Sequence, residues 1–146
     1  MKSVFERAIE LLQENKTVKV FAPTGIWAID GEKDKWIEAL SNTRSVDRTF
    51  IAGLAPSPKY EEIVSRRLNL MVEGGVNVYT IEPQDCFRLG FMVFDKIALV
   101  GFTGTDEKEL RYFETDEQEI TRVLGWVLDD VIRHREQKDT KKVAEN

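Results

Sequence analysis

The chain has 146 residues, of which 42% are hydrophobic and 32% charged, a composition typical of one soluble globular domain with its own hydrophobic core. Its net charge of −5 and pI of about 5.1 argue against a dedicated nucleic-acid-binding domain, although a local basic patch is compatible with both values. The single cysteine, Cys86, excludes an internal disulfide and suits a reducing compartment, and since neither a run of about 18 apolar residues nor a signal peptide is present, we expect a cytoplasmic protein without a membrane span.

The first half of the chain alternates between helix and strand patterns. Ser3 is a helix N-cap followed by apolar residues at helical spacing, and Ser57 with Pro58 starts another helix, which Gly74 and Gly75 close. We expect, in chain order, a helix after Ser3, a strand over 17–22, a helix over 35–40, a strand over 47–52, a helix from Pro58 and a strand over 76–81. This order predicts a mainly parallel sheet with right-handed crossovers.

Two further strands are expected in the middle of the chain, over 88–94 and 97–102. Their residues are mostly apolar, which predicts strands buried on both faces near the centre of the sheet. The turn between them, at Asp95 and Lys96, is too short for a crossover, so the two strands are predicted to form an antiparallel hairpin.

The last part of the chain predicts one more strand, over 109–114, and a long helix from about Asp116 to about Glu136 that begins at a capping box over 115–118. Its apolar residues are expected to face inward: Ile120, Val123, Leu124, Val127, Val131 and Ile132. We expect a single α/β domain over 1–137 and a charged, disordered tail over 138–146. The expected fold is α/β, with a mixed sheet in which a parallel βαβαβ unit is followed by an antiparallel hairpin, and with helices on both faces.

The hairpin resembles the centre of a half-domain of the phospholipase D-like superfamily. That family carries a histidine, one spacer and a lysine on a strand, then an apolar strand that ends in Asp, a turn, a second apolar strand and Gly-Ser with a nearby Asn. The strand that ends in Asp95 and the strand that ends in Gly101 match this pattern, as does the Gly-Gly-Val-Asn-Val segment at 74–78. The resemblance covers most of the chain, from about residue 3 to about residue 136.

Four departures from that pattern bear on function. Arg88 stands at the histidine position and Gly90 at the lysine position, while Phe102 replaces the serine and Gly104 the asparagine. In the family the histidine attacks phosphorus and the lysine neutralises phosphate charge; arginine cannot act as that nucleophile and glycine supplies no charge. The only histidine, His134, is expected to be a solvated residue near the end of the last helix. The resemblance therefore implies the fold without its phosphodiesterase activity, and we expect no enzyme.

Half-domains degenerate in this way are similar to the effector domains of archaeal winged-helix transcriptional regulators of the TrmB type, which sense a small molecule. The segment 109–115 running into a long amphipathic helix is also similar to that group. This chain contains no helix-turn-helix of its own, so no direct contact with nucleic acid is expected. The resemblance implies a regulatory domain that is fused to, or works with, a winged-helix DNA-binding domain.

Candidate ligand-binding residues were chosen for their expected place in the sheet. Thr24 and Trp27 follow the first strand at its carboxyl end, where open α/β sheets bind ligands; the competing interpretations are a plain turn and a packed tryptophan. Arg88 could bind an anion through its two-pronged guanidinium or form a structural ion pair with a nearby acid. Asp95 is a further candidate that is also the simplest turn residue, and Thr103 could contact a phosphate, although the segment lacks the lysine of a P-loop.

No cofactor or metal is expected, because no second cysteine or histidine lies at ligand spacing from Cys86. Three functions remain in competition. The first is a non-catalytic, effector-type domain that binds a small or anionic molecule. The second is a protein-interaction or dimerisation module, since phospholipase D-like halves commonly pair. The third is a divergent phosphodiesterase that uses Arg88, Asp85 and Asp95 in new roles.

Overall fold

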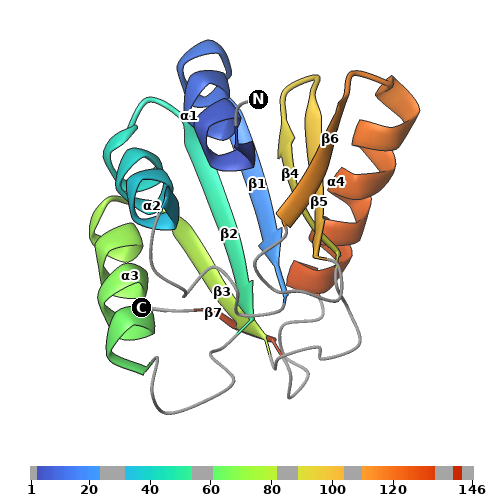
Figure 1. The fold of residues 1–146 in the computed structure, drawn as a ribbon. Coiled ribbons are helices and arrows are strands. Elements are labelled where there is room, and N and C mark those ends of the chain that lie inside the picture. Colours follow the sequence, from blue (N-terminus) through green and yellow to red (C-terminus); the bar gives the residue numbers. More distant parts are fainter. Residues whose placement is uncertain are drawn as a thin grey trace.

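A single mixed sheet organises the computed structural model (Figure 1), which describes residues 3–23, 32–53, 61–81, 89–103, 110–133 and 140–142. The described elements are α1 (Val4–Glu14), β1 (Thr17–Ala22), α2 (Glu32–Asn42), β2 (Asp47–Gly53), α3 (Glu61–Glu73), β3 (Asn77–Ile81), β4 (Leu89–Phe94), β5 (Ala98–Thr103), β6 (Leu110–Thr115), α4 (Gln118–Arg133) and β7 (Thr140–Lys142).

The strand order in the sheet is β6-β5-β4-β1-β2-β3-β7. Strands β1, β2 and β3 run parallel, whereas β4 is antiparallel to β1 and forms an antiparallel hairpin with β5, to which β6 adds a further antiparallel strand. The predicted parallel unit followed by an antiparallel hairpin is therefore confirmed. Because β4 pairs with β1, the hairpin lies directly against the first strand of the parallel unit.

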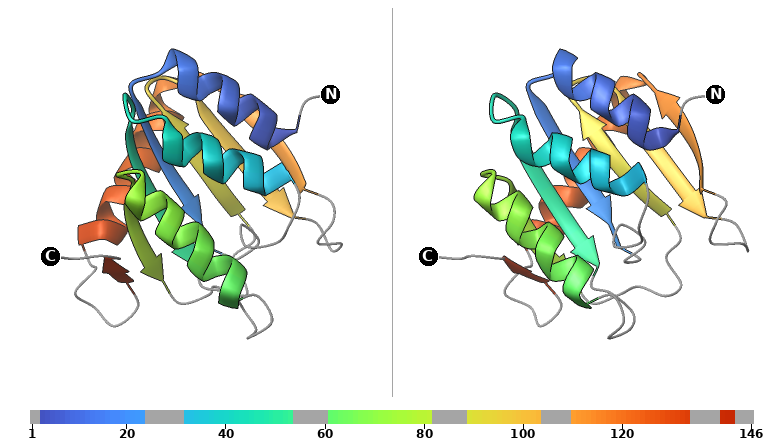
Figure 2. Two further views of the ribbon diagram at one scale, coloured as in Figure 1. Left: turned by 90° about the vertical axis from the view of Figure 1, so that its left-hand side faces the viewer. Right: turned by 60° about the vertical axis from the view of Figure 1, so that its left-hand side comes forward.

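Helices cover both faces of the sheet, as predicted. Figure 2 shows α1, α2 and α3 side by side across one face, with α4 on the opposite face. The larger core lies under the three helices and includes Leu11 of α1, Leu40 of α2, Phe50 of β2 and Phe94 of β4. The smaller core lies under α4, where Leu128 is fully buried against sheet residues that include Ile51. The described part of the chain contains no helix long and apolar enough to cross a membrane.

Local signals explain where two of the helices begin and end. The Ser3 hydroxyl oxygen accepts a hydrogen bond from the Glu6 amide at 3.2 Å, which caps the start of α1. After α3, Gly75 has a φ of +89°, a left-handed conformation that suits glycine. A Cβ added to the neighbouring Gly74 would lie 2.1 Å from the Ser41 carbonyl oxygen, so this turn packs against the end of α2.

A buried arginine connects the ends of α2 and α3. Arg48, near the start of β2, is 4% exposed, and its guanidinium donates four hydrogen bonds to backbone carbonyl oxygens. The acceptors are those of Leu40 (2.7 Å), Ser41 (2.9 Å), Val46 (2.9 Å) and Gly74 (2.7 Å). Two of these belong to the last turn of α2 and one follows α3, where helix carbonyls lack intrahelical partners. One side chain thus caps two helices and satisfies its own buried charge.

Two sequence-based expectations are corrected. The segment expected to be a disordered tail contains β7, whose Thr140–Lys142 pair antiparallel with β3. This pairing uses backbone groups and needs no apolar side chains, so the apolar pattern of the sequence does not reveal it. In α4, Ile120, Val123 and Val127 do not face inward: they are 42%, 50% and 41% exposed. The apolar stripe of this helix is wider than the sheet surface on which it packs.

Candidate functional site

The carboxyl ends of the parallel strands lie at one edge of the sheet, here called the carboxyl edge. Ala22, Gly53 and Ile81 end β1, β2 and β3 at this edge. Because β4 runs antiparallel to β1, and β5 antiparallel to β4, the first residue of β4, Leu89, and the last of β5, Thr103, reach the same edge. Five strands therefore bring their termini together here, which is where open α/β sheets bind ligands.

Three of the predicted site residues, Thr24, Trp27 and Arg88, lie outside the described residues. Their described neighbours Pro23 and Leu89 both adjoin the carboxyl edge, on strands that pair with each other. The backbone of Thr103 ends β5 at the same edge, and its side chain is outside the described part. The topology thus brings the chain next to Thr24 and Arg88 to adjacent strands, as the choice of these residues requires.

Two glycines allow the backbone to approach closely at the carboxyl edge. A Cβ on Gly53 would lie 2.1 Å from the Pro23 carbonyl oxygen, and a Cβ on Gly90 would lie 3.0 Å from the Phe21 carbonyl oxygen. Gly90 occupies the position of the family's lysine. The backbone of β1 leaves little space for any side chain there, so regaining that lysine would require β4 to shift.

Asp95 does not belong to the site, which corrects the prediction. It follows the end of β4 opposite to Leu89, and the register pairs Phe94 with Val18 near the start of β1. Its carboxylate accepts hydrogen bonds from the Lys16 amide (2.9 Å), the Thr17 amide (2.9 Å) and the Thr17 hydroxyl (2.7 Å). Desolvation acts to raise the pKa of Asp95, but these three hydrogen bonds together outweigh it and hold the pKa below its ordinary value. Asp95 therefore joins the hairpin to the start of β1.

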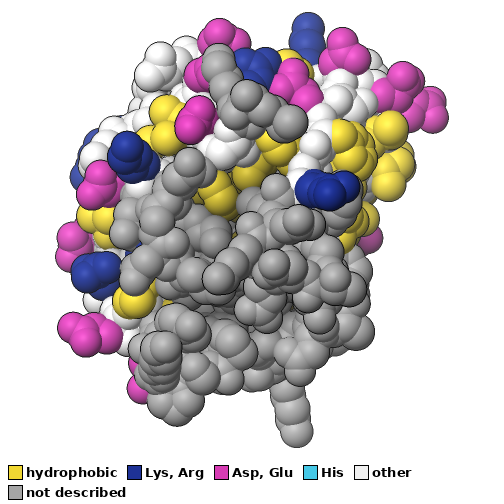
Figure 3. Space-filling model, viewed as in Figure 1, with side chains coloured by type: hydrophobic (Ala, Val, Ile, Leu, Met, Phe, Trp, Pro, Cys, Tyr) yellow, Lys and Arg dark blue, Asp and Glu magenta, His cyan; other side chains and the backbone are white. Residues whose placement is uncertain are grey.

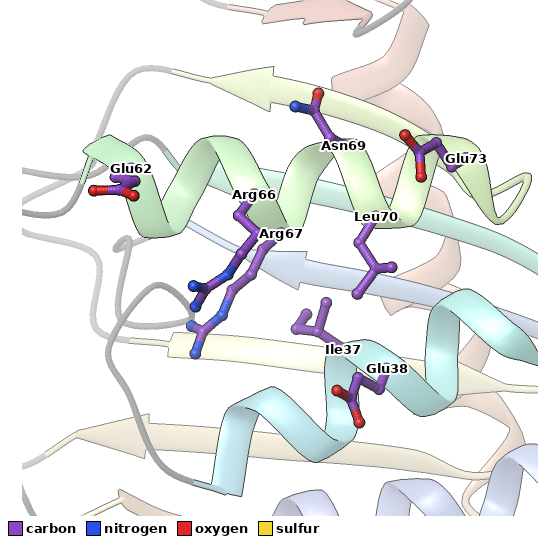
Figure 4. A pocket seen from close by; sticks show the side chains of 8 residues that line it. All are labelled: Ile37, Glu38, Glu62, Arg66, Arg67, Asn69, Leu70 and Glu73. Atoms are coloured by element: carbon purple, nitrogen blue, oxygen red, sulfur yellow. The ribbon is translucent and has the colours of Figure 1, made fainter.

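A groove of about 750 Å³ lies between α2 and α3. Figure 4 shows Ile37 of α2 and Leu70 of α3 pointing toward each other across it, with the guanidinium ends of Arg66 and Arg67 side by side nearer the start of α3. Arg67 is 2% exposed, whereas Arg66 is exposed. The remaining lining residues are polar: Glu38, Glu62, Asn69 and Glu73.

The two arginines point toward the carboxyl edge. Helices α2 and α3 both start on that side of the sheet and run back toward its opposite edge, where Gly74 and Gly75 lead into β3. The groove therefore has a cationic end beside the strand termini and an apolar middle formed by Ile37 and Leu70. No cluster of three or more His, Cys, Asp or Glu side chains that could hold a metal occurs in the described part of the chain.

Sequence reasoning missed these arginines as site residues. The available signal was Arg67, which lies three residues after Val64 and four before Met71, on the buried stripe of the helix. A charged residue on an apolar stripe is unusual unless it is paired or functional. Nothing in the pattern indicates that Arg66 turns toward the same groove.

Comparisons with known proteins define the fold. No protein-family model and no curated protein matches the sequence. Among solved structures, Nuc, a phospholipase D family member from Salmonella typhimurium, has a TM-score of 0.69 at 10% identity, over 98% of this chain and 92% of that one. TrmBL2, described as an archaeal chromatin protein with a novel mode of DNA binding, has a TM-score of 0.60 at 14% identity, over 94% of this chain and 50% of that one.

The chain therefore has a phospholipase D-like fold, which confirms the expected fold and its structural resemblance to TrmB-type proteins. It corresponds to nearly the whole of Nuc but to about half the length of TrmBL2. At these identities the likeness concerns the fold alone, so the function has to be argued from the site.

Proposed function

We propose that this chain is a non-catalytic, effector-type regulatory domain that binds a small anionic molecule in the groove between α2 and α3. The observation that supports this most directly is the pair of guanidinium groups, Arg66 and Arg67, at the end of the groove beside the carboxyl edge. Two like charges at close range repel each other, and an anion bound by both lowers their energy. Guanidinium groups suit this role because each can donate two parallel hydrogen bonds to a phosphate or carboxylate.

The rest of the groove narrows the class of ligand. Ile37 and Leu70 offer an apolar surface for the body of a small molecule, as ligand sites commonly do. Glu38, Glu62 and Glu73 add negative charge along the groove. A polyanion such as nucleic acid would be repelled by these carboxylates, so a molecule with one anionic group and a mostly neutral body suits the groove better.

The absence of catalysis is supported by the positions that the family uses for chemistry. Arg88 and Gly90 replace the nucleophile and the charge-neutralising lysine, and the Phe21 carbonyl disfavours any side chain at Gly90. Asp95 adjoins the opposite edge of the sheet from Leu89, so it does not complete a site beside Arg88. The divergent-phosphodiesterase hypothesis therefore loses one of its proposed groups.

A regulatory role draws on the likeness to TrmBL2, of which this chain spans about half. By analogy, DNA would be contacted by a separate winged-helix domain, fused or associated, while this domain senses the ligand. The net charge of −5 agrees with a domain that does not itself grip DNA. Such a regulator would act in the cytoplasm, in an archaeal-type transcription system.

Thermal-shift measurements with matched ligands test the proposal. Glucose 6-phosphate and glucose differ only in the phosphate, and inorganic phosphate supplies the anion alone. A ligand present at about 100 times its Kd stabilises the folded state by about 2.7 kcal/mol, which raises Tm by roughly 5–10 °C in a domain of this size. We expect phosphate esters to raise Tm more than their neutral partners do.

The variant Arg66→Ala should abolish the shift, because Arg66 is exposed and its removal leaves the core intact. Arg122→Ala, on α4, is the matched control and should leave the shift unchanged. Equal shifts with glucose and its phosphate, or a shift that survives Arg66→Ala, would contradict an anion site in this groove. Turnover of bis-p-nitrophenyl phosphate that disappears in Arg88→Ala would overturn the non-catalytic assignment.

A further inference from the structure

Helix α4 and strand β6 carry an exposed apolar surface, here called the α4 surface. Five large hydrophobic side chains form it: Phe113 (49% exposed), Ile120 (42%), Val123 (50%), Trp126 (58%) and Val127 (41%). Figure 3 shows hydrophobic side chains gathered on the side of the molecule where β6 and α4 lie. Single exposed apolar residues are ordinary, but several on one element and its neighbour mark an interaction site.

The position of α4 makes these residues continuous. The Lys19 ammonium on β1 pairs with the Asp129 carboxylate at 2.8 Å, which directs one flank of α4 toward β1. Ile120 precedes Asp129 by nine residues, about two and a half helical turns, so it lies on the opposite flank, toward β5 and β6. Phe113 projects from the same face of the sheet as its neighbour Val100, which is buried in the core under α4. The flank of α4 and the face of β6 therefore border the same uncovered apolar region.

The spacing along α4 suits a second helix. Ile120, Val123 and Val127 stand at positions i, i+3 and i+7, the apolar seam of paired helices. Trp126 lies beside this seam on the outer flank, where residues of two paired helices meet across the interface. A helical partner would cover the seam, and it would also cover Phe113 if it lay over β6.

The charges beside the seam are complementary to themselves. Glu119 lies seven residues before Trp126 and Arg133 seven residues after it; Arg122 lies four before and Asp130 four after. If a second α4 packs antiparallel with the two Trp126 residues opposite each other, Glu119 meets the second copy's arginine at 133, and Arg122 meets its aspartate at 130. A parallel pair would instead set like charges opposite each other, which is unfavourable.

We propose that two copies of this chain associate through the α4 surface, α4 packing antiparallel to α4 about Trp126. The existing ion pair between Asp130 and Arg133, at 3.6 Å with both side chains more than 60% exposed, is weak enough to rearrange on association. A membrane surface is a poorer occupant, because a membrane-binding helix carries an excess of basic residues on its polar face, whereas α4 mixes both signs.

Sedimentation velocity over a concentration series tests this with the full chain. We expect a reversible dimer of the 16.8 kDa chain. Val123→Glu should give a monomer whose thermal stability is close to that of the unchanged protein, since Val123 is exposed in the single chain. Glu14→Arg, an exposed charge change at the end of α1, is the control and should leave association unchanged.

A charge exchange tests the antiparallel register. Glu119→Arg and Arg133→Glu, each alone, bring like charges together and should weaken the dimer roughly tenfold. The double variant restores opposite charges and should recover most of the affinity. A chain that stays monomeric at about 0.5 mM, a dimer unaffected by Val123→Glu, or a double variant as weak as the single ones would each overturn the proposal, as would binding to anionic vesicles by a chain that does not self-associate.

Discussion

Replacing Arg48 by methionine should destabilise the protein by about 3–5 kcal/mol, because it removes a buried cation that four carbonyl oxygens depend on. Methionine fills a similar volume but donates no hydrogen bond. The carbonyls of Leu40, Ser41 and Gly74 would then stand at buried helix ends without this donor. The perturbation therefore acts on the ends of α2 and α3 together.

The magnitude follows from two opposing contributions. Hydrogen bonds to a charged group contribute about 1.5–3 kcal/mol each, and Arg48 makes four. Against this stands the desolvation of a guanidinium that is 4% exposed, an effective penalty of several kcal/mol. Their difference is about 3–5 kcal/mol, a large share of the roughly 5–15 kcal/mol that stabilises a typical domain.

Urea denaturation followed by far-UV circular dichroism gives the free energy of unfolding, and the m-value should stay unchanged. Arg44→Met is the matched control: Arg44 is exposed and donates one hydrogen bond, at 3.2 Å, to the Glu73 carbonyl, so its loss should amount to less than about 1 kcal/mol. Arg48→Lys should remain about 2–3 kcal/mol less stable, because an ammonium has three donors and lacks the planar fork.

Burial is the main cause of a lowered pKa of Arg48, assisted by the charge of Arg44 and opposed by Asp47. An arginine nevertheless stays charged throughout the usable pH range, so the difference between Arg48→Met and the unchanged protein should not vary between pH 6 and pH 9. If Arg48→Met and Arg44→Met lowered stability equally, the buried arginine would not be the connection between the two helices.

Three further predictions concern stability. Gly125→Ala should stabilise α4 by about 0.5–1 kcal/mol, because alanine favours helix and a Cβ there meets no atom within 4 Å; no gain in urea midpoint would contradict this. Gly53→Ala should destabilise by about 2 kcal/mol or more, because its Cβ would lie 2.1 Å from the Pro23 carbonyl oxygen; full stability in the same titration would refute that close approach. Asp95→Asn should lower stability at pH 7 by about 1 kcal/mol. The folded-state pKa of Asp95 is depressed, so its contribution is present above pH 4 and fades as the pH falls further; a difference from the unchanged protein that stays constant from pH 7 to pH 3 would contradict this.

The sequence predicted the sheet well because each strand has a local signature. The strands expected over 17–22 and 47–52 are observed as Thr17–Ala22 and Asp47–Gly53, and the hairpin was recognised from its short turn. The helix expected over 35–40 is longer, Glu32–Asn42, because its polar ends carry no apolar period. The orientation of α4 was partly wrong because an apolar stripe indicates a buried face without stating how much surface lies opposite it.

The site was less accessible to sequence reasoning. Thr24 and Thr103 were chosen from topology alone, which fixes the ends of strands but not the side chains around them. Asp95 was grouped with Arg88 although β4 separates the two positions by its full length. Arg66 and Arg67 converge only because α2 packs against α3, a tertiary contact that no local pattern encodes.

The connection made by Arg48 has a mechanical consequence for the groove. The guanidinium holds α2 and α3 together at their carboxyl-terminal ends, whereas Arg66 and Arg67 lie toward the opposite, amino-terminal ends of these helices. Any separation of the two helices is then a rotation about a fixed point, widest beside the strand termini and smallest at Arg48. A molecule entering between the arginines acts at the long end of this lever, so a small displacement at Arg48 corresponds to a larger one where the ligand would bind.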